Sequence, residues 1–144
     1  MTSSRIAATT AAAALALTVV GLTGCAQIHQ QVGDAWSVTY EVTVDSPDAT
    51  PLHDVRYDGA ERRGAAPETH TVTSTSTKAG TGGNTSWTRD TIVLTQDDAS
   101  VRATPPAGRT ASCRILLDGE KVIAEELGHP GEPVRCAATT PDFS

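Results

Sequence analysis

Apolar and polar residues alternate strictly from residue 36 to residue 45. The apolar residues hold every second position: Trp36, Val38, Tyr40, Val42, Val44. A period of two places these side chains on one face of a β-strand, so the segment predicts a strand with one buried face. Turn residues follow at Ser46-Pro47-Asp48, and Val55 and Tyr57 then continue the pattern up to Asp58-Gly59. We expect the two strands to form a hairpin.

The stretch from residue 59 to residue 85 has a different composition, because it is rich in Thr, Ser, Gly and Ala and poor in large apolar residues. Thr69–Thr77 has strong β-propensity but little to bury except Val72, which is typical of an edge strand or a long hairpin arm. Lys78–Asn84, which contains Gly80-Thr81-Gly82-Gly83, is expected to be a flexible loop tip. We therefore expect a flexible arm over residues 59–85.

Short strand patterns separated by turns fill the rest of the chain. They cover residues 87–94, 101–103, 111–117, 121–125 and 133–138. Asp118-Gly119 is a strong hairpin signal between two of them, and Glu120–Leu127 is a faint helix candidate. The pattern predicts an all-β fold, an immunoglobulin-like β-sandwich of about seven short antiparallel strands. We expect its few aromatic residues (Trp36, Tyr40, Tyr57, Trp87) to pack mainly in the core, whereas a cluster exposed on one rim would indicate a binding face.

An apolar run precedes the first strand and ends in Leu22-Thr23-Gly24-Cys25. The run is too short and too rich in Thr for a stable membrane span, and Arg5 gives it the positive start of a signal peptide. A hydrophobic residue, two small residues and a Cys form a lipobox, in which Cys25 receives a diacylglycerol and cleavage falls before it. The alternatives are an uncleaved anchor or an ordinary secretory signal with a chance Cys.

These features divide the chain into three parts: a lipoprotein signal peptide at 1–24, a polar tether at 25–35 and a β-sandwich domain at 36–144. The protein is expected on the extracytoplasmic face of the cell membrane, attached to the bilayer through the lipid on Cys25. Two or three acyl chains anchor a protein stably, whereas one chain is marginal.

The chain has 144 residues and a formal net charge of −6. Arg5 is the only charged side chain before Cys25, so the processed chain carries about −7. Nucleic-acid binding needs a basic surface, so we expect no nucleic-acid partner. The dispersed acidic charge also argues against electrostatic binding to anionic headgroups.

Two cysteines remain after Cys25 has been used for lipid. Cys113 and Cys136 lie 23 positions apart and, in an oxidising compartment, predict a disulfide worth roughly 3 kcal/mol. A zinc pair is the alternative, but neither cysteine has a neighbouring Cys or His.

Candidate chemistry is sparse. No Gly-x-Ser-x-Gly motif is present, and the histidines (His29, His53, His70, His129) have no spacing typical of a metal site. Asp97-Asp98 and Glu125-Glu126 fit a solvated turn and a charged strand end better than a cation site. We expect no enzyme activity, no catalytic residue, no metal and no cofactor other than the lipid.

The C-terminal block resembles the MmpS family (mycobacterial membrane protein, small). The resemblance rests on Ala111-Ser112-Cys113-Arg114-Ile115-Leu116-Leu117-Asp118-Gly119-Glu120-Lys121-Val122 followed by Val134-Arg135-Cys136-Ala137. Tyr40-Glu41-Val42, Val55-Arg56-Tyr57-Asp58, Trp87 and Val101-Arg102-Ala103 come before it in the expected order. The resemblance covers residues 36–138 apart from the middle arm.

The resemblance implies a small β-sandwich with a Cys113–Cys136 disulfide, acting as an accessory protein to a large RND-type transporter of the MmpL kind that exports lipids, siderophores or drugs. This chain differs from the family in its lipobox, where a membrane helix is usual, and in its longer middle arm. A free-standing envelope lipoprotein that binds a ligand or a protein is the second hypothesis. A large apolar pocket between the sheets would favour it.

Overall fold

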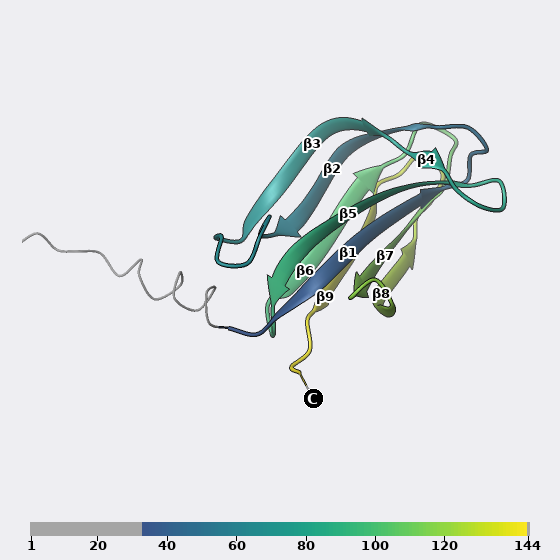
Figure 1. Ribbon diagram of the computed structural model, residues 1–144. Coiled ribbons are helices and arrows are strands. Elements are labelled where there is room, and N and C mark those ends of the chain that lie inside the picture. Colours follow the sequence, from purple (N-terminus) through teal and green to yellow (C-terminus); the bar gives the residue numbers. More distant parts are fainter. Residues whose placement is uncertain (1–32, 144) are drawn as a thin grey trace, which may run out of the picture.

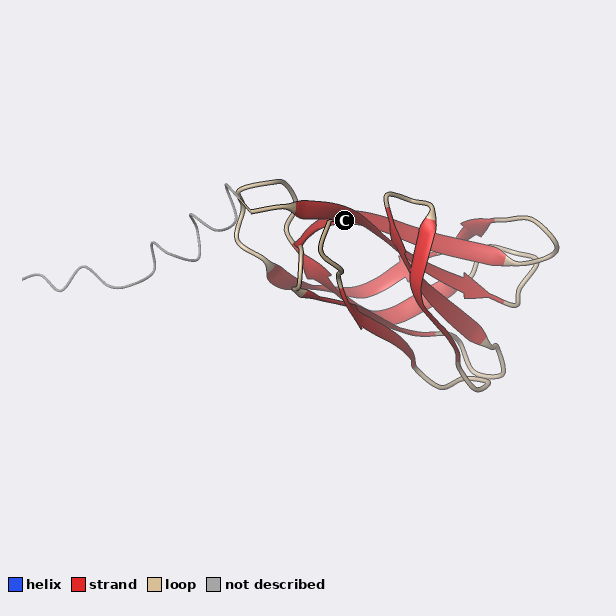
Figure 2. Cartoon of the chain, turned by 90° about the horizontal axis from the view of Figure 1, so that it is seen from below, coloured by secondary structure: helices blue, strands red, loops and turns tan. Residues whose placement is uncertain are grey.

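A computed structural model describes residues 33–143. Nine strands form two antiparallel sheets, and every element in the described part of the chain is a strand, turn or loop (Figure 1, Figure 2). The strands are β1 (Ala35–Val44), β2 (Pro51–Gly59), β3 (Glu68–Ser76), β4 (Lys78–Ala79), β5 (Thr85–Leu94), β6 (Asp98–Thr104), β7 (Ala111–Leu117), β8 (Lys121–Leu127) and β9 (Val134–Thr139). The all-β sandwich is confirmed, with two more strands than expected. The signal peptide, the lipobox and most of the tether lie outside the described residues.

One sheet has the order β4-β5-β1-β7-β8 and the other has the order β3-β2-β6-β9. The core lies between the sheets and follows the alternation of the sequence. In β1, for example, Val38, Tyr40, Val42 and Val44 are fully buried while the residues between them are partly exposed. Tyr40 and Tyr57 belong to the core, and Trp36 and Trp87 pack against it half-buried.

The predicted hairpin of the first two strands is wrong. β1 pairs with β5 on one side and β7 on the other, whereas β2 pairs with β3 and β6 in the opposite sheet. The turn between them crosses from one sheet to the other, and the buried hydroxyls of Ser46 and Thr50 bond to each other there (2.9 Å). The alternating pattern identifies each strand, but long-range pairing determines its partners.

The middle segment, residues 59–85, contains β3, the short β4 and the beginning of β5, so it is not one long loop. Of the two interpretations of Thr69–Thr77, the edge strand is confirmed: β3 ends the order of its sheet. The chain then crosses to the other sheet at Thr77, whose buried hydroxyl accepts a hydrogen bond from the amide of Thr50 (2.9 Å) and lies 2.8 Å from the hydroxyl of Thr85.

The hairpin at Asp118-Gly119 is confirmed. It joins β7 to β8, and both turn residues have a positive φ (52° and 72°), as a tight two-residue turn requires. The faint helix candidate at 120–127 is wrong, because Lys121–Leu127 is strand β8. β9 does not continue this sheet but pairs with β6 in the other sheet.

The strands run between two ends of the sandwich. The beginning of β1, the ends of β5 and β9 and the loop after β2 lie at one end of the sandwich. We call it the anchor end because the first described residues, which follow Cys25 in the sequence, lie there. The described C-terminus returns to this end. The indole of Trp36 donates to the carbonyl of Pro141 (2.8 Å), and its ring stacks on Phe143 (4.2 Å between centroids).

Candidate functional site

The disulfide joins the two sheets. Cys113 on β7 and Cys136 on β9 are fully buried and bonded, with 5.9 Å between their Cα atoms. The sequence predicted the bond, but not that it connects the two layers of the sandwich. In the structure the bond links opposite layers, because β7 and β9 belong to different sheets.

An aromatic cluster fills the opposite side of the sandwich, between β3 and β5. Tyr57 is at its centre: its ring stacks on His70 (4.8 Å) and is tilted against Trp87 (5.9 Å) and Tyr40 (6.0 Å). The guanidinium of Arg89 lies 5.6 Å from the centre of the Tyr57 ring, within the range of a cation–π contact. Three of the four aromatic residues flagged in the sequence (Tyr40, Tyr57 and Trp87) therefore belong to this cluster.

Tyr40 is the most deeply buried member of this cluster. Its hydroxyl donates to the backbone carbonyl of Asp58 (2.7 Å). Burial raises the pKa of the Tyr40 phenol well above its usual value, and the charge of Asp58 raises it further. The ring therefore stays neutral at physiological pH and acts as a structural group.

The side chains of this cluster lie between β3 and β5, which belong to different sheets. The two sheets are joined at the anchor end by the bridge between Ala60 and Ile92. At the other end β4 crosses over and pairs with Ser86 and Thr85 of β5. Side chains rather than backbone hydrogen bonds hold the sandwich closed between these two points.

A groove opens beside β4. It has a volume of about 240 Å³ and is lined by Thr75, Ser76, Lys78, Ser86, Trp87 and Thr88. We call it the Trp87 groove. Ser86 also lines a neighbouring hollow, which contains Glu41, Thr43, Gly80, Thr81, Asn84 and Thr85. Sequence reasoning assigned Trp87 to the core and Lys78 to a loop tip, because hydroxyl-rich strands give no periodic signal of a groove.

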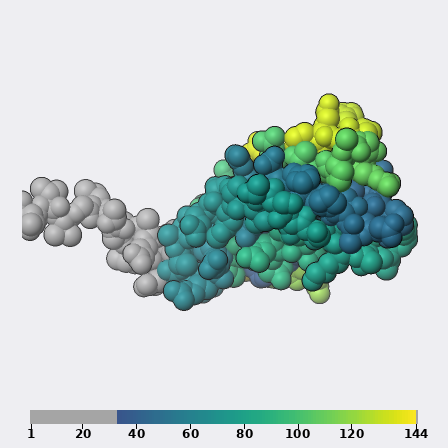
Figure 3. Space-filling view, turned by 90° about the horizontal axis from the view of Figure 1, so that it is seen from above, coloured from purple at the N-terminus to yellow at the C-terminus, as the bar shows by residue number. Residues whose placement is uncertain are grey.

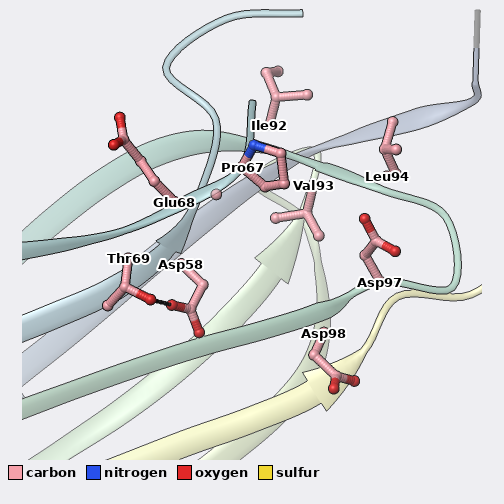
Figure 4. Close-up of a pocket in the computed structure, with 10 residues that line it drawn as sticks. Asp58, Pro67, Glu68, Thr69, Ile92, Val93, Leu94, Asp97 and Asp98 are labelled. Atoms are coloured by element: carbon pink, nitrogen blue, oxygen red, sulfur yellow. Dashed lines mark hydrogen bonds between the residues drawn. The ribbon is translucent and has the colours of Figure 1, made fainter. Parts of the chain in front are cut away.

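A third hollow lies at the anchor end and is acidic (Figure 4). Asp58, Glu68, Asp97 and Asp98 line it, together with apolar residues of β5. The Asp58 carboxylate is already engaged, since it accepts hydrogen bonds from the hydroxyls of Thr69 (2.6 Å) and Ser100. Asp58 on β2 is therefore a structural group that is hydrogen-bonded to side chains of β3 and β6.

The remaining candidate residues are dispersed. His53 and His129 are exposed, while His70 stacks on Tyr57 and lies 3.1 Å from the carbonyl of Gly59. Glu125 and Glu126 are exposed on β8, across the molecule from Asp97-Asp98. Across residues 33–143, no three His, Cys, Asp or Glu side chains are grouped so as to hold a metal ion. Cys25 and its lipobox, and His29, lie outside that range.

The two sheets end in edge strands of contrasting character. β8 carries Lys121, Glu125 and Glu126, charged residues of the kind that discourage further strand pairing. β3 is nine residues long, has no buried position and has no Lys, Arg, Asp or Glu after Glu68. Figure 3 shows the face on which this segment lies, where the teal residues of the middle of the chain cover much of the surface.

No protein-family model matches this chain, and no curated protein matches it at a significant level. Within residues 33–143, no helix has the length and hydrophobicity of a membrane span.

Proposed function

We propose that this protein is an extracytoplasmic lipoprotein, anchored to the cell membrane by lipid on Cys25, that acts as a non-catalytic accessory subunit of an RND-type (MmpL-like) exporter of lipids, siderophores or drugs. The lipobox and the resemblance to the MmpS family support the anchor and the class of partner. Cys25 lies ten positions before Ala35, where β1 begins. Ten residues span at most about 35 Å, so the anchor would keep the domain close to the bilayer.

The observation that carries the docking part of this proposal is the exposed edge of β3. Its backbone pairs with β2 on one side, which leaves the other edge able to pair with an extended segment of a partner. Soluble domains usually protect such an edge with charged residues or proline, as β8 is protected here. Thr71 and Thr73 are exposed on β3 and offer only hydroxyls.

Crosslinking in native membranes tests this proposal. The full-length lipoprotein is crosslinked, purified and identified with its partners by mass spectrometry. Deleting residues 59–85 would remove β3 and β4, so a point variant is preferable. Thr73→Lys places a charge on the β3 edge, and Ala137→Lys, on the exposed face of edge strand β9 in the same sheet, is the matched control.

Recovery of one RND-type transporter, lost with Thr73→Lys and kept with Ala137→Lys, is the expected result. Recovery of abundant envelope proteins alone would reject the accessory role. The second candidate is then a free-standing envelope lipoprotein that binds a ligand. The Trp87 groove favours that alternative, because it is a surface hollow lined mainly by Ser and Thr residues.

A further inference from the structure

We propose that the outer face of the four-stranded sheet lies on the bilayer, where a row of three arginines contacts the phosphate groups of zwitterionic phospholipids. This inference rests on the lipid anchor of the proposed function but not on the transporter partner. It is carried by the register of β2, β6 and β9, by the exposure of the three side chains and by the short tether to Cys25.

The strand register places Arg56, Arg102 and Arg135 side by side. Arg56 on β2 pairs with Arg102 on β6, and Arg102 pairs with Arg135 on β9. All three side chains are exposed, whereas the residues before and after each of them on its strand are buried in the core. Because side chains alternate between the two faces of a strand, the three arginines share the outer face of the sheet.

This arginine row is unfavourable unless an anionic partner covers it. Like charges that lie directly opposite each other on neighbouring strands destabilise a sheet. Neighbouring strands are about 4.8 Å apart, so the row is about 10 Å long from β2 to β9. Guanidinium groups bind phosphate through paired hydrogen bonds and are more weakly hydrated than ammonium groups. A surface rich in phosphate groups therefore complements the row in charge and in hydrogen bonding.

Two carboxylates lie beside the arginine row on the same face, and both accept hydrogen bonds from hydroxyls. Asp58 accepts from side chains of β3 and β6, and Asp98 accepts from Thr139 (2.8 Å). Arg135 and the two carboxylates line a hollow of about 360 Å³. The face therefore has a basic row next to acidic groups. A zwitterionic headgroup, in which an ammonium follows a phosphate, offers a partner to each.

The acidic composition of the chain is compatible with this contact. The net charge of −6 argues against binding to anionic headgroups. A zwitterionic bilayer has no net charge that would repel the domain, and the arginine row attracts its phosphates locally. Composition does not reveal the row, because its members come from three strands that are far apart in the sequence.

The anchor brings the bilayer within reach of this face. Cys25 lies ten positions before Ala35, a span of at most about 35 Å, so the headgroups are present at a high effective concentration even where each contact is weak. The free edge of β3 belongs to the same sheet. A domain resting on this face would direct that edge along the membrane, toward neighbouring membrane proteins.

Paramagnetic relaxation enhancement in nanodiscs tests the orientation. Isotopically labelled full-length lipoprotein, with its lipid confirmed by mass spectrometry, is inserted into phosphatidylcholine nanodiscs that contain a gadolinium-chelating lipid. The two sheets of a sandwich are about 10 Å apart, and broadening falls steeply with distance from the headgroups. We expect the amide signals of β6 and β9 to be broadened severalfold more than those of β1 and β7. The difference should disappear in nanodiscs of digalactosyldiacylglycerol, which has no phosphate.

Matched variants separate the arginine row from the general charge of the domain. Arg56→Gln/Arg135→Gln removes two charges from the row and is expected to abolish the difference between the sheets. Arg62→Gln/Lys121→Gln removes two exposed charges elsewhere and is expected to retain it. All four side chains are exposed, so neither variant disturbs the core.

The outcomes distinguish this inference from the anchor on which it rests. Lipidated protein with equal broadening of both sheets would overturn the inference and leave the anchor intact, whereas a chain without lipid would reject both. The inference also fails if the two variants behave alike or if galactolipid nanodiscs give the same orientation. A saturable shift of the arginine Nε–H signals with free glycerol phosphate, without a preferred orientation on the bilayer, would assign the row to a soluble phosphate instead.

Discussion

Gly59 and Thr91 are in such close contact that the glycine has no room for a side chain. A Cβ on Gly59 would lie 2.2 Å from Oγ1 and 2.7 Å from Cγ2 of Thr91. Gly59 also has a φ of +145°, which side chains rarely allow. The contact lies at the end of β2, where the Thr91 hydroxyl donates to the carbonyl of Ala60 (2.9 Å) and the Ala60–Ile92 bridge joins the two sheets.

Gly59→Ala is therefore expected to lower the free energy of unfolding by about 2–4 kcal/mol, because it adds both overlap and backbone strain. Thr91→Ala removes the two clashing atoms, so the double variant should recover part of the loss relative to the sum of the two single variants. Urea unfolding of all four proteins measures this coupling. Additive losses would show that steric contact is not the cause.

The inter-sheet disulfide should contribute strongly to stability. Replacing both cysteines, in Cys113→Ala/Cys136→Ala, is expected to cost about 3 kcal/mol, since the bond closes a loop of the unfolded chain. The wild-type protein under reducing conditions serves as a comparison and should show a similar drop in its denaturation midpoint. A variant as stable as the oxidised wild type would contradict this role.

Tyr40 should make stability depend on pH in the alkaline range. Burial raises the pKa of its phenol in the folded state, so the unfolded chain loses this proton first, near its ordinary pKa of about 10. The contribution is fully present below that pH and declines as pH rises above it. In Tyr40→Phe this decline should be smaller, although the variant loses about 1 kcal/mol at neutral pH with the hydrogen bond to Asp58.

Thermal unfolding of wild type and Tyr40→Phe between pH 8 and pH 11 measures the difference, with the ordinary tyrosine pKa as reference. Parallel curves for the two proteins would show that Tyr40 does not cause the alkaline loss. Because Tyr57 packs against Tyr40, Tyr57→Phe is the control for a second phenol in the same cluster.

Cys25 is expected to determine processing. Cys25→Ala should accumulate as unprocessed precursor without lipid, whereas Cys113→Ala/Cys136→Ala should be processed normally, because only Cys25 follows Leu22-Thr23-Gly24. Mass spectrometry of the membrane fraction distinguishes precursor from lipidated mature protein. Cleavage of Cys25→Ala at the same position would reject the lipobox and the proposed anchor with it.

The sequence predicts the strands of this protein better than their partners. Period-two alternation identified β1, and Asp118-Gly119 identified the β7–β8 turn, because both signals are local. The crossing between β1 and β2 was missed, since Ser46-Pro47-Asp48 is equally suited to a hairpin and to a link between layers. Only the pairing of β1 with β5 and β7, far along the chain, decides between the two.

The same distinction between local signals and long-range pairing applies to the candidate sites. Cys113 and Cys136 could be paired because just two cysteines remain after Cys25, but their position across the layers depends on where β9 pairs. The Trp87 groove gave no signal, because its lining comes from three strands and consists largely of Ser and Thr. Those residues are common throughout the middle segment and line a groove only because β4 crosses beside β5.

The central place of β1 has a mechanical consequence. A tension applied between Cys25 and a partner bound elsewhere on the domain would enter the fold at Ala35, the first residue of β1. That strand forms ten residue pairs with β5 and seven with β7, running along the direction of pull. The hydrogen bonds of β1 to its two neighbours would be loaded together in shear rather than broken one after another. The domain is therefore expected to stay folded when it is pulled through its lipid anchor.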